Sequence, residues 1–271
     1  MTFQYCLNAS TIRPTPILDK IRIAGDVGYA AIELWHDDIE AYVAAGGKLA
    51  DIKKALADAG LALPTTIYLP GWCDTTGAAH EEALELIKRR MAASAELGSA
   101  HIIACPALGK VDVTLAARNY RELVDLGLSF GVKASMEYLG FVEQINTIES
   151  ALEIMTLSGH PQATIIIDPF HNFRGGGAFS SISKLRGEQI AISHFNDTPA
   201  SPPRLEQHDH SRVLPGEGHL DLKEWCDLLK QVGYRGYLSL ELFREDLWAR
   251  DPREVATLGL AKMQSVVEAK V

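Results

Sequence analysis

The chain has 271 residues, of which 47% are hydrophobic and 23% are charged, a composition that is typical of globular proteins and excludes disordered and collagen-like chains. The formal net charge of −9 gives no general attraction for nucleic acid or anionic lipid. We therefore expect a small-molecule partner, no nucleic acid and no membrane.

Eight short runs rich in apolar and β-branched residues are spaced along the whole chain. In order they are FQYCLNA (3–9), AAIELW (30–35), ALPTTIYL (62–69), HIIACP (101–106), VKASMEY (132–138), ATIIID (163–168), QIAISHF (189–195) and GYLSLEL (236–242). Helical patterns lie between them, as in residues 81–98, where apolar residues recur at helical spacing. Glycines that can end such helices follow several of these patterns, at Gly60, Gly98, Gly131 and Gly233.

Alternating strand and helix patterns of this number predict an α/β fold, a closed (β/α)₈ TIM barrel in a single domain. An open doubly wound sheet is the alternative. Such a sheet usually carries a glycine-rich turn after its first strand, and residues 8–15, NASTIRPT, contain no glycine. No Pro/Gly/Ser-rich linker divides the chain.

The four cysteines, Cys6, Cys73, Cys105 and Cys226, are scattered without a CxxC pair, so we expect reduced thiols and no disulfide framework. The first residues, MTFQYCLNAS, lack a basic stretch followed by an apolar run. No segment approaches the roughly 18 apolar residues that a membrane span requires. These features predict a cytoplasmic protein.

Three acids and one histidine stand in or at the exit of the last four strand runs, at Glu137, Asp168, His194 and Glu241. In a barrel these ends meet at one face. A buried carboxylate is costly unless something compensates it, and each residue alone would also fit a helix cap, an ion pair or the core. The set of four on successive strands favours one shared divalent cation, with Mn²⁺, Mg²⁺, Co²⁺ and Zn²⁺ all compatible with such ligands.

Two further polar residues are candidate substrate contacts. His171 follows Asp168 by three residues in TIIIDPFHNF (164–173), where it can donate a hydrogen bond to a substrate oxygen or lie exposed in a loop. Arg212 precedes the PGEG turn, which either folds it inward onto a substrate oxygen or leaves it solvated. The polar stretch 208–210 is given no role.

Other residues near the strand ends leave their roles open. Trp35, Tyr68, Trp72 and Phe243 form either apolar walls for a sugar ring or part of the core. Glu33, near the end of the second run, is either a polar substrate contact or the buried partner of an arginine.

The motifs at these positions resemble the xylose-isomerase-like TIM barrels, a family that includes inosose isomerase, hydroxypyruvate isomerase, ketose 3-epimerases and, more distantly, endonuclease IV. The resemblance covers essentially residues 1–271, expected as one such domain. Its most specific parts are MEY, DPFH, HFND, RVLPGEG and LSLELF. In its overall sequence pattern the chain is most similar to the inosose isomerases, through the segments YCLNAST, NTIESALEIM and RVLPGEGHLDL.

The resemblance implies a sugar isomerase or epimerase with one divalent ion, Mn²⁺ being the first choice, held by Glu137, Asp168, His194 and Glu241. Glu137 and Glu241 would be the catalytic bases on opposite faces of a keto-polyol or ketose, and the reaction would pass through a cis-enediol or enediolate. His171 and Arg212 would orient substrate oxygens.

A third candidate substrate contact comes from the same resemblance. Glu143 lies six residues after Glu137, the spacing at which ketose 3-epimerases keep a substrate-binding glutamate. It equally fits a helix-leading acid before a helix expected near residue 146.

Several alternatives to an inosose isomerase-like activity follow. The first are a ketose 3-epimerase and a hydroxypyruvate isomerase. An endonuclease IV-like nuclease is disfavoured because the third and fourth runs lack an exit histidine and the net charge is −9. A non-catalytic sugar-binding barrel is disfavoured because all four ligands are present. The family also makes a homo-oligomer an expectation.

Overall fold

The structure is a computed structural model that describes residues 3–269. The ends of the predicted domain, residues 1–2 and 270–271, lie outside the described residues. Eight parallel strands pair in chain order and close into a barrel. The strands are β1 (Gln4–Asn8), β2 (Ala31–Trp35), β3 (Thr65–Leu69), β4 (His101–Ala104), β5 (Lys133–Glu137), β6 (Thr164–Ile167), β7 (Ile190–His194) and β8 (Tyr237–Leu240).

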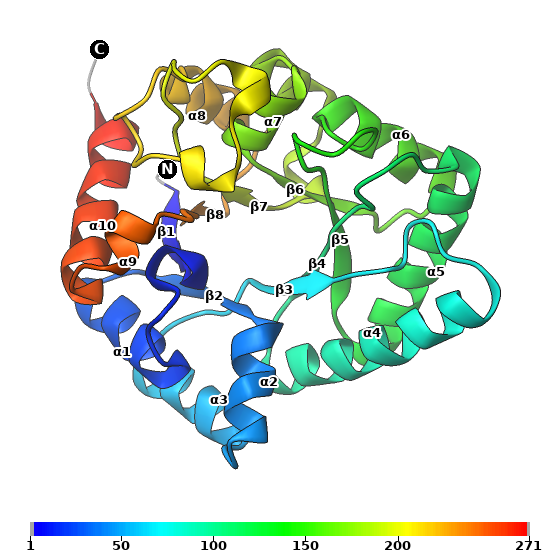
Figure 1. The fold of residues 1–271 in the computed structure, drawn as a ribbon, viewed down its shortest axis with the longest axis horizontal. Helices are drawn as coiled ribbons and strands as arrows, with labels where there is room; N and C mark the ends of the chain where they lie inside the picture. Colours follow the sequence, from blue (N-terminus) through cyan, green and yellow to red (C-terminus); the bar gives the residue numbers. More distant parts are fainter. Residues whose placement is uncertain (1–2, 270–271) are drawn as a thin grey trace.

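The predicted (β/α)₈ barrel is therefore confirmed, and the open sheet is wrong. In Figure 1 the helices surround the strands as an outer ring. The helices are α1 (Ile17–Val27), α2 (His36–Ala44), α3 (Leu49–Asp58), α4 (Gly77–Leu97), α5 (Val113–Phe130), α6 (Ile148–Ser158), α7 (Pro169–Gly175), α8 (Leu222–Gln231), α9 (Glu245–Trp248) and α10 (Pro252–Glu268).

Local sequence explains where these helices begin and end. Asp112 caps α5 because its side chain accepts hydrogen bonds from the backbone N–H groups of Thr114 and Leu115. The same helix ends at Gly131, whose φ of 84° lies in the left-handed region that glycine adopts without strain. Left-handed glycines also end α1, α4 and α6, at Gly28, Gly98 and Gly159.

Two hydrophobic cores result from the alternation of side chains along the strands. The larger core packs the helices on the barrel, and the smaller one consists of Cys6, Ala31, Ile67, Ile103, Ile166 and Ile192. Asp168 and His194 each stand two residues after a member of the smaller core, so they project from the same inner face of their strands. The barrel interior therefore leads directly to the predicted site.

No helix among residues 3–269 is both long enough and apolar enough to cross a membrane. The four cysteines are free thiols, as the sequence predicts.

Candidate functional site

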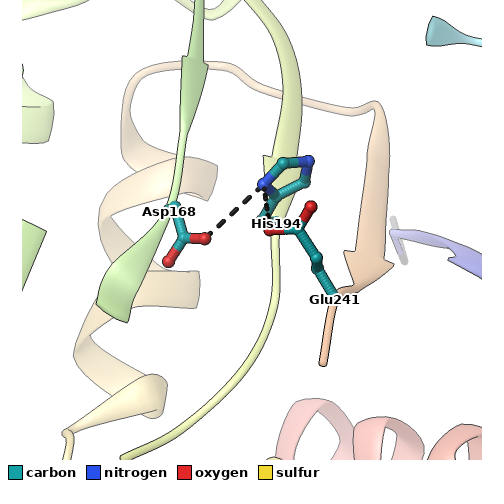
Figure 2. Close-up of side chains that lie close together, drawn as sticks. All are labelled: Asp168, His194 and Glu241. Atoms are coloured by element: carbon teal, nitrogen blue, oxygen red, sulfur yellow. Dashed lines mark ion pairs between the residues drawn. The ribbon is translucent and has the colours of Figure 1, made fainter. Parts of the chain in front are cut away.

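The four predicted metal ligands meet at the carboxyl end of the barrel. Nδ1 of His194 lies 3.1 Å from Oε2 of Glu241, 3.5 Å from Oδ2 of Asp168 and 3.5 Å from Oε1 of Glu137. Figure 2 shows Asp168 and Glu241 approaching the same ring nitrogen of His194 from two sides. One ligand atom each from Asp168, His194 and Glu241 can be chosen so that all three lie within 4.8 Å of one another.

The donor set fits a divalent cation. All four residues are at most 5% exposed, and both ring nitrogens of His194 are buried without a hydrogen-bond partner in the described structure. Nδ1 faces three carboxylates, while Nε2 faces Glu33 at 3.4 Å. Burial lowers the pKa of His194, but Glu241 and Glu33 raise it well above its usual value, so the metal-free ring carries a proton on both nitrogens. A divalent ion would take the place of the Nδ1 proton between the three carboxylates.

The pKa values of the cluster reflect this crowding of charge. Burial and the nearby Glu241 carboxylate raise the pKa of Glu137 to about 8, although His194 opposes the shift. Burial also raises the pKa of Asp168, but Arg212, His171 and His194 outweigh it and hold that pKa well below its usual value. The raised pKa of Glu137 favours its protonated form near neutral pH, and a positive charge beside it would favour the carboxylate.

Arg212 is folded inward and fully buried. Its guanidinium lies between the rings of Phe170 and Phe243, 4.5 Å and 5.2 Å from their centroids. Its Nη2 lies 3.1 Å from Oδ2 of Asp168 and 3.4 Å from Oε2 of Glu241. Stacking on two rings and pairing with two acids fix the guanidinium at the edge of the cluster.

The HFND motif holds the loop that carries Arg212. Oδ2 of Asp197 accepts hydrogen bonds from the backbone of Gly216 and Gly218, and its Oδ1 accepts one from Leu220. A side chain at Gly218 would lie 2.2 Å from that carboxylate, so the close approach requires glycine there. The PGEG turn is thus fixed by a buried acid that sequence reasoning had not singled out.

His171 is held in one orientation by its neighbours. Asp168 caps α7 by accepting a hydrogen bond from the His171 backbone, and Gly140 N–H donates to Nδ1 of the ring at 3.2 Å. Burial and Arg212 lower the pKa of His171 to about 4, so the ring is neutral near pH 7. Because Nδ1 accepts, the ring proton lies on Nε2, which is 2.9 Å from Nη2 of Arg212.

Nε2–H and the guanidinium are both donors, so with this tautomer they do not satisfy each other. An acceptor oxygen placed against His171 and Arg212 would satisfy both. The structure thus brings these two predicted substrate contacts together beside the predicted metal ligands.

Glu143 is not brought to the cluster. Its side chain is 53% exposed and lies 3.7 Å from Nζ of Lys110, and it is outside the residues that line the cavity at the barrel mouth among those described. The helix expected near residue 146 begins at Ile148 with Thr147 as its N-cap, so Glu143 stands in the preceding loop. A direct substrate contact for Glu143 has no support in this position.

The structure bears on two of the roles that the sequence left open, those of Trp72 and Glu33. Trp72 belongs to the core, because it is fully buried and packs 5.7 Å from the Tyr120 ring. Glu33 is buried, but the expected arginine partner is wrong: its described partners are His194, Asn8, Thr65 and Ser239.

A cavity of about 350 Å³ opens beside the cluster, within the range of small-molecule sites. Its polar lining comes from Cys105, Glu137, His171, Asp209, Arg212 and Glu241. Its apolar walls include Trp35, Tyr68, Phe141 and Phe243. The aromatic walls anticipated at Trp35, Tyr68 and Phe243 are therefore present, and Phe141 adds to them.

Sequence reasoning missed several residues that touch the cluster. Asn8 donates from Nδ2 to Glu33 and to Oε1 of Glu241, and Asn196 donates to Oδ2 of Asp168. Sγ of Cys105 donates to Oε2 of Glu137 at 3.3 Å. Each stands at or just after a strand end, which is the signal that could have found them.

Comparison with known proteins identifies a matching protein family and solved structures with the same fold. The family described as xylose isomerase-like TIM barrel matches residues 21–265. Among solved structures, the IOLI protein, whose crystal structure holds a zinc atom, superposes with a TM-score of 0.91 over 98% of both chains at 24% identity.

Curated relatives are similar at comparable identity. Inosose isomerase of Bacillus licheniformis is 29% identical over 194 residues, which are 69% of each protein. The 3-dehydroshikimate dehydratase of Pseudomonas aeruginosa is 28% identical over 254 residues, which are 90% of this chain but only 39% of that protein. The chain therefore spans about two fifths of the dehydratase.

Proposed function

Because the chain belongs to the xylose isomerase-like TIM barrel family, we propose that it is a divalent-metal-dependent isomerase or epimerase of a keto-polyol or ketose, similar in activity to inosose isomerase. The observation that carries this proposal is the convergence of Glu137, Asp168 and Glu241 on Nδ1 of His194 beside the cavity. The proposed domain is the whole of residues 1–271.

The proposed ligands of the ion are Glu137, Asp168, His194 and Glu241, and Mn²⁺ is the proposed native metal. When bound there, a divalent ion supplies Lewis-acid polarisation of a carbonyl and its neighbouring hydroxyl. Glu137 and Glu241 both line the cavity, and they come from strand ends separated by β6 and β7. One of them takes the proton from the carbon beside the carbonyl, and a proton returned to another carbon or face gives the isomer or epimer.

His171 and Arg212 are proposed to bind the oxygen that gains negative charge. Nε2–H of His171 and Nη2 of Arg212 lie next to each other and both donate. An oxygen acceptor opposite them receives two hydrogen bonds from groups that are already fixed by Gly140, Phe170 and Phe243. Donors that need no reorganisation stabilise developing charge most effectively.

The charges around the cavity favour an uncharged substrate. Arg212 is the only lysine or arginine among the described lining residues, and it already pairs with Asp168, Asp209 and Glu241. Among the described lining side chains, a substrate carboxylate would therefore meet no lysine or arginine that is not already paired with acids. A neutral keto-polyol can bind in this cavity through hydrogen bonds and through packing against the aromatic walls.

A dehydratase is the second candidate, because the match to 3-dehydroshikimate dehydratase covers 90% of this chain. Its substrate carries a carboxylate, so the charge argument above disfavours it. Abstraction of a proton beside a carbonyl would be the shared first step, followed by loss of a hydroxyl group instead of return of a proton. The two candidates therefore differ in their product and in water release.

The test is to incubate metal-loaded protein in deuterium oxide with inososes, ketohexoses, hydroxypyruvate and 3-dehydroshikimate, and to follow each by NMR. We expect deuterium at the carbon beside the carbonyl of a neutral keto-polyol, with an isomer or epimer as product. Dehydration of 3-dehydroshikimate alone would select the second candidate, and no exchange with any compound would contradict both.

The proposed setting is a small-molecule substrate in the cytoplasm without a nucleic-acid partner, supported by the net charge of −9. A homo-oligomer remains part of the proposal.

A further inference from the structure

A second layer of polar side chains lies directly behind the proposed metal ligands, and Glu33 is its centre. Glu33 stands on the inner face of β2 between Ala31 and Trp35 and is 0% exposed. It is outside the described cavity lining, so it has no direct path to a substrate. A buried carboxylate that does not meet substrate needs another reason to be there.

The neighbours of Glu33 show that its carboxylate acts as an acceptor. The hydroxyl of Thr65 donates to Oε1, and the hydroxyl of Ser239 and Nδ2 of Asn8 donate to Oε2. Hydroxyl and amide donors from three other strands, β3, β8 and β1, thus hold the group in one position. These donors satisfy part of an ionised carboxylate without a cation.

The remaining neighbour of Glu33 is the imidazole of His194. Oε2 of Glu33 lies 3.4 Å from Nε2 of the ring, on the side away from Glu137, Asp168 and Glu241. A carboxylate there selects the tautomer with its proton on Nε2 and directs the lone pair of Nδ1 toward the three acids.

Asn8 extends the same layer to Glu241. Its Nδ2 lies 3.1 Å from Oε2 of Glu33 and 3.0 Å from Oε1 of Glu241. Its Oδ1 accepts from Nε1 of Trp35 and from the backbone of Ser10, so the amide cannot turn over without losing these bonds. One oxygen of Glu241 is thereby tied back, and the other, Oε2, faces Nδ1 of His194 at 3.1 Å.

We propose that Glu33 is a positioning residue that orients His194 directly and Glu241 through Asn8, and thereby sets the affinity of the site for its divalent ion. The inference rests on the metal centre of the proposed function. It assigns to Glu33 a role in holding ligands, not in binding the ion or the substrate. Such carboxylate partners of a metal-bound histidine typically change metal affinity by about 10- to 100-fold.

The test compares wild type with E33Q by titrating each metal-free protein with Co²⁺ and following visible absorption, with a competing chelator to obtain affinities. We expect E33Q to bind Co²⁺ about 10- to 100-fold more weakly. E40Q is the matched control, because Glu40 pairs with Arg90 outside the cluster, and it should bind as wild type does.

A second readout follows the His194 ring itself. In Zn²⁺-loaded wild type, proton–nitrogen NMR correlations should show His194 with its proton on Nε2, and E33Q should shift or broaden that signal. A purely structural role for Glu33 would lower thermal stability without changing either the ring signal or the Co²⁺ affinity of the folded fraction.

Wild-type affinity and an unmoved ring signal in E33Q would overturn the proposal. If E33Q does not fold, the Co²⁺ affinities of T65V and S239A test the proposal, because each substitution removes one hydroxyl that holds Glu33. Several-fold weaker Co²⁺ binding supports the proposal, and unchanged Co²⁺ binding in both variants overturns it. A wild-type protein that fails to bind Co²⁺ would instead contradict the metal centre of the proposed function.

Discussion

The two ends of the barrel each hold a histidine on the inner face, and the two rings have opposite surroundings. At the mouth, burial lowers the pKa of His194, but Glu241 and Glu33 outweigh it and the pKa lies well above its usual value. At the floor, His101 begins β4, its Nδ1 lies 2.8 Å from Oγ of Ser135, and burial with Lys133 lowers its pKa to about 4.

The difference shows where the barrel keeps unbalanced charge. Ser135 also bonds to Thr164, so the floor is a neutral network that is satisfied within the protein. The mouth gathers acids that lack sufficient cationic partners within the protein. In TIM barrels the carboxyl end of the strands carries the chemistry and the other end carries stability, and the two histidines follow that division.

The largest expected effect concerns a glutamate at the mouth. E241Q keeps the shape of the side chain but removes a proton acceptor and a charge, so deuterium exchange into the substrate should fall by about 10²- to 10⁴-fold. Exchange is measured by NMR with the compound that wild type accepts. E85Q, which changes an exposed acid of α4 paired with Lys88, is the control, and wild-type exchange in E241Q would remove Glu241 from the proposed base and ligand roles.

The second prediction concerns thermal stability, which a bound metal ion should raise through residues at the mouth of the barrel and not through residues at the opposite end. A divalent ion at about 100 times its dissociation constant adds about 2.7 kcal/mol of stability, so Mn²⁺ or Zn²⁺ should raise the melting temperature of metal-free protein by about 5–10 °C. Calorimetry or fluorescence melting measures it. D168N should lose the shift and His101→Asn should keep it; an equal shift in D168N would place the ion elsewhere.

The third prediction concerns the pH dependence of folding stability that arises from His101, at the end of the barrel opposite the mouth. The pKa of His101 falls from 6.5 in the unfolded chain to about 4 in the folded protein, so the unfolded chain binds more protons between these values. Folding stability should therefore fall as pH drops from 6.5 toward 4, by about 2 kcal/mol from this residue. Urea unfolding at several pH values measures it. In His101→Asn the decline should be shallower, and an identical pH profile would contradict a neutral floor histidine.

The smallest effect concerns the wall of the cavity. W35F keeps an aromatic wall but removes the hydrogen bond from Nε1 of Trp35 to Oδ1 of Asn8. Loss of one such bond costs about 1 kcal/mol, so KM should rise about fivefold with little change in kcat. Steady-state kinetics with the accepted substrate measures both; a large fall in kcat would assign Trp35 to the chemical step.

Much of the fold was predictable from the sequence because apolar runs and helix stops are local signals. Seven of the eight expected runs differ from the observed strands by no more than two residues at either end, and the third begins at Thr65 instead of residue 62. Residues 62–64 precede the strand, and Ala62 forms an isolated β-bridge with Ala31.

The site was predictable only in part. A carboxylate at the exit of an apolar strand is visible in the sequence, and the four proposed ligands do converge in space. The partners of Glu33 come from β1, β3, β7 and β8, and pairings between distant strands leave no local pattern. The position of Glu143 outside the cavity lining was also not visible in the sequence, because its spacing from Glu137 does not determine which way the loop turns, and its role as a substrate contact stays a prediction.

The central claim is that the mouth of the barrel holds one divalent ion between Glu137, Asp168, His194 and Glu241. The most direct measurement is elemental analysis of protein that has been stripped with a chelator, dialysed against Mn²⁺, Co²⁺ or Zn²⁺ and freed of unbound metal, beside D168N treated in the same way. The account predicts one ion per wild-type chain and a clear loss in D168N; no retained ion in wild type, or equal retention in both proteins, would contradict it.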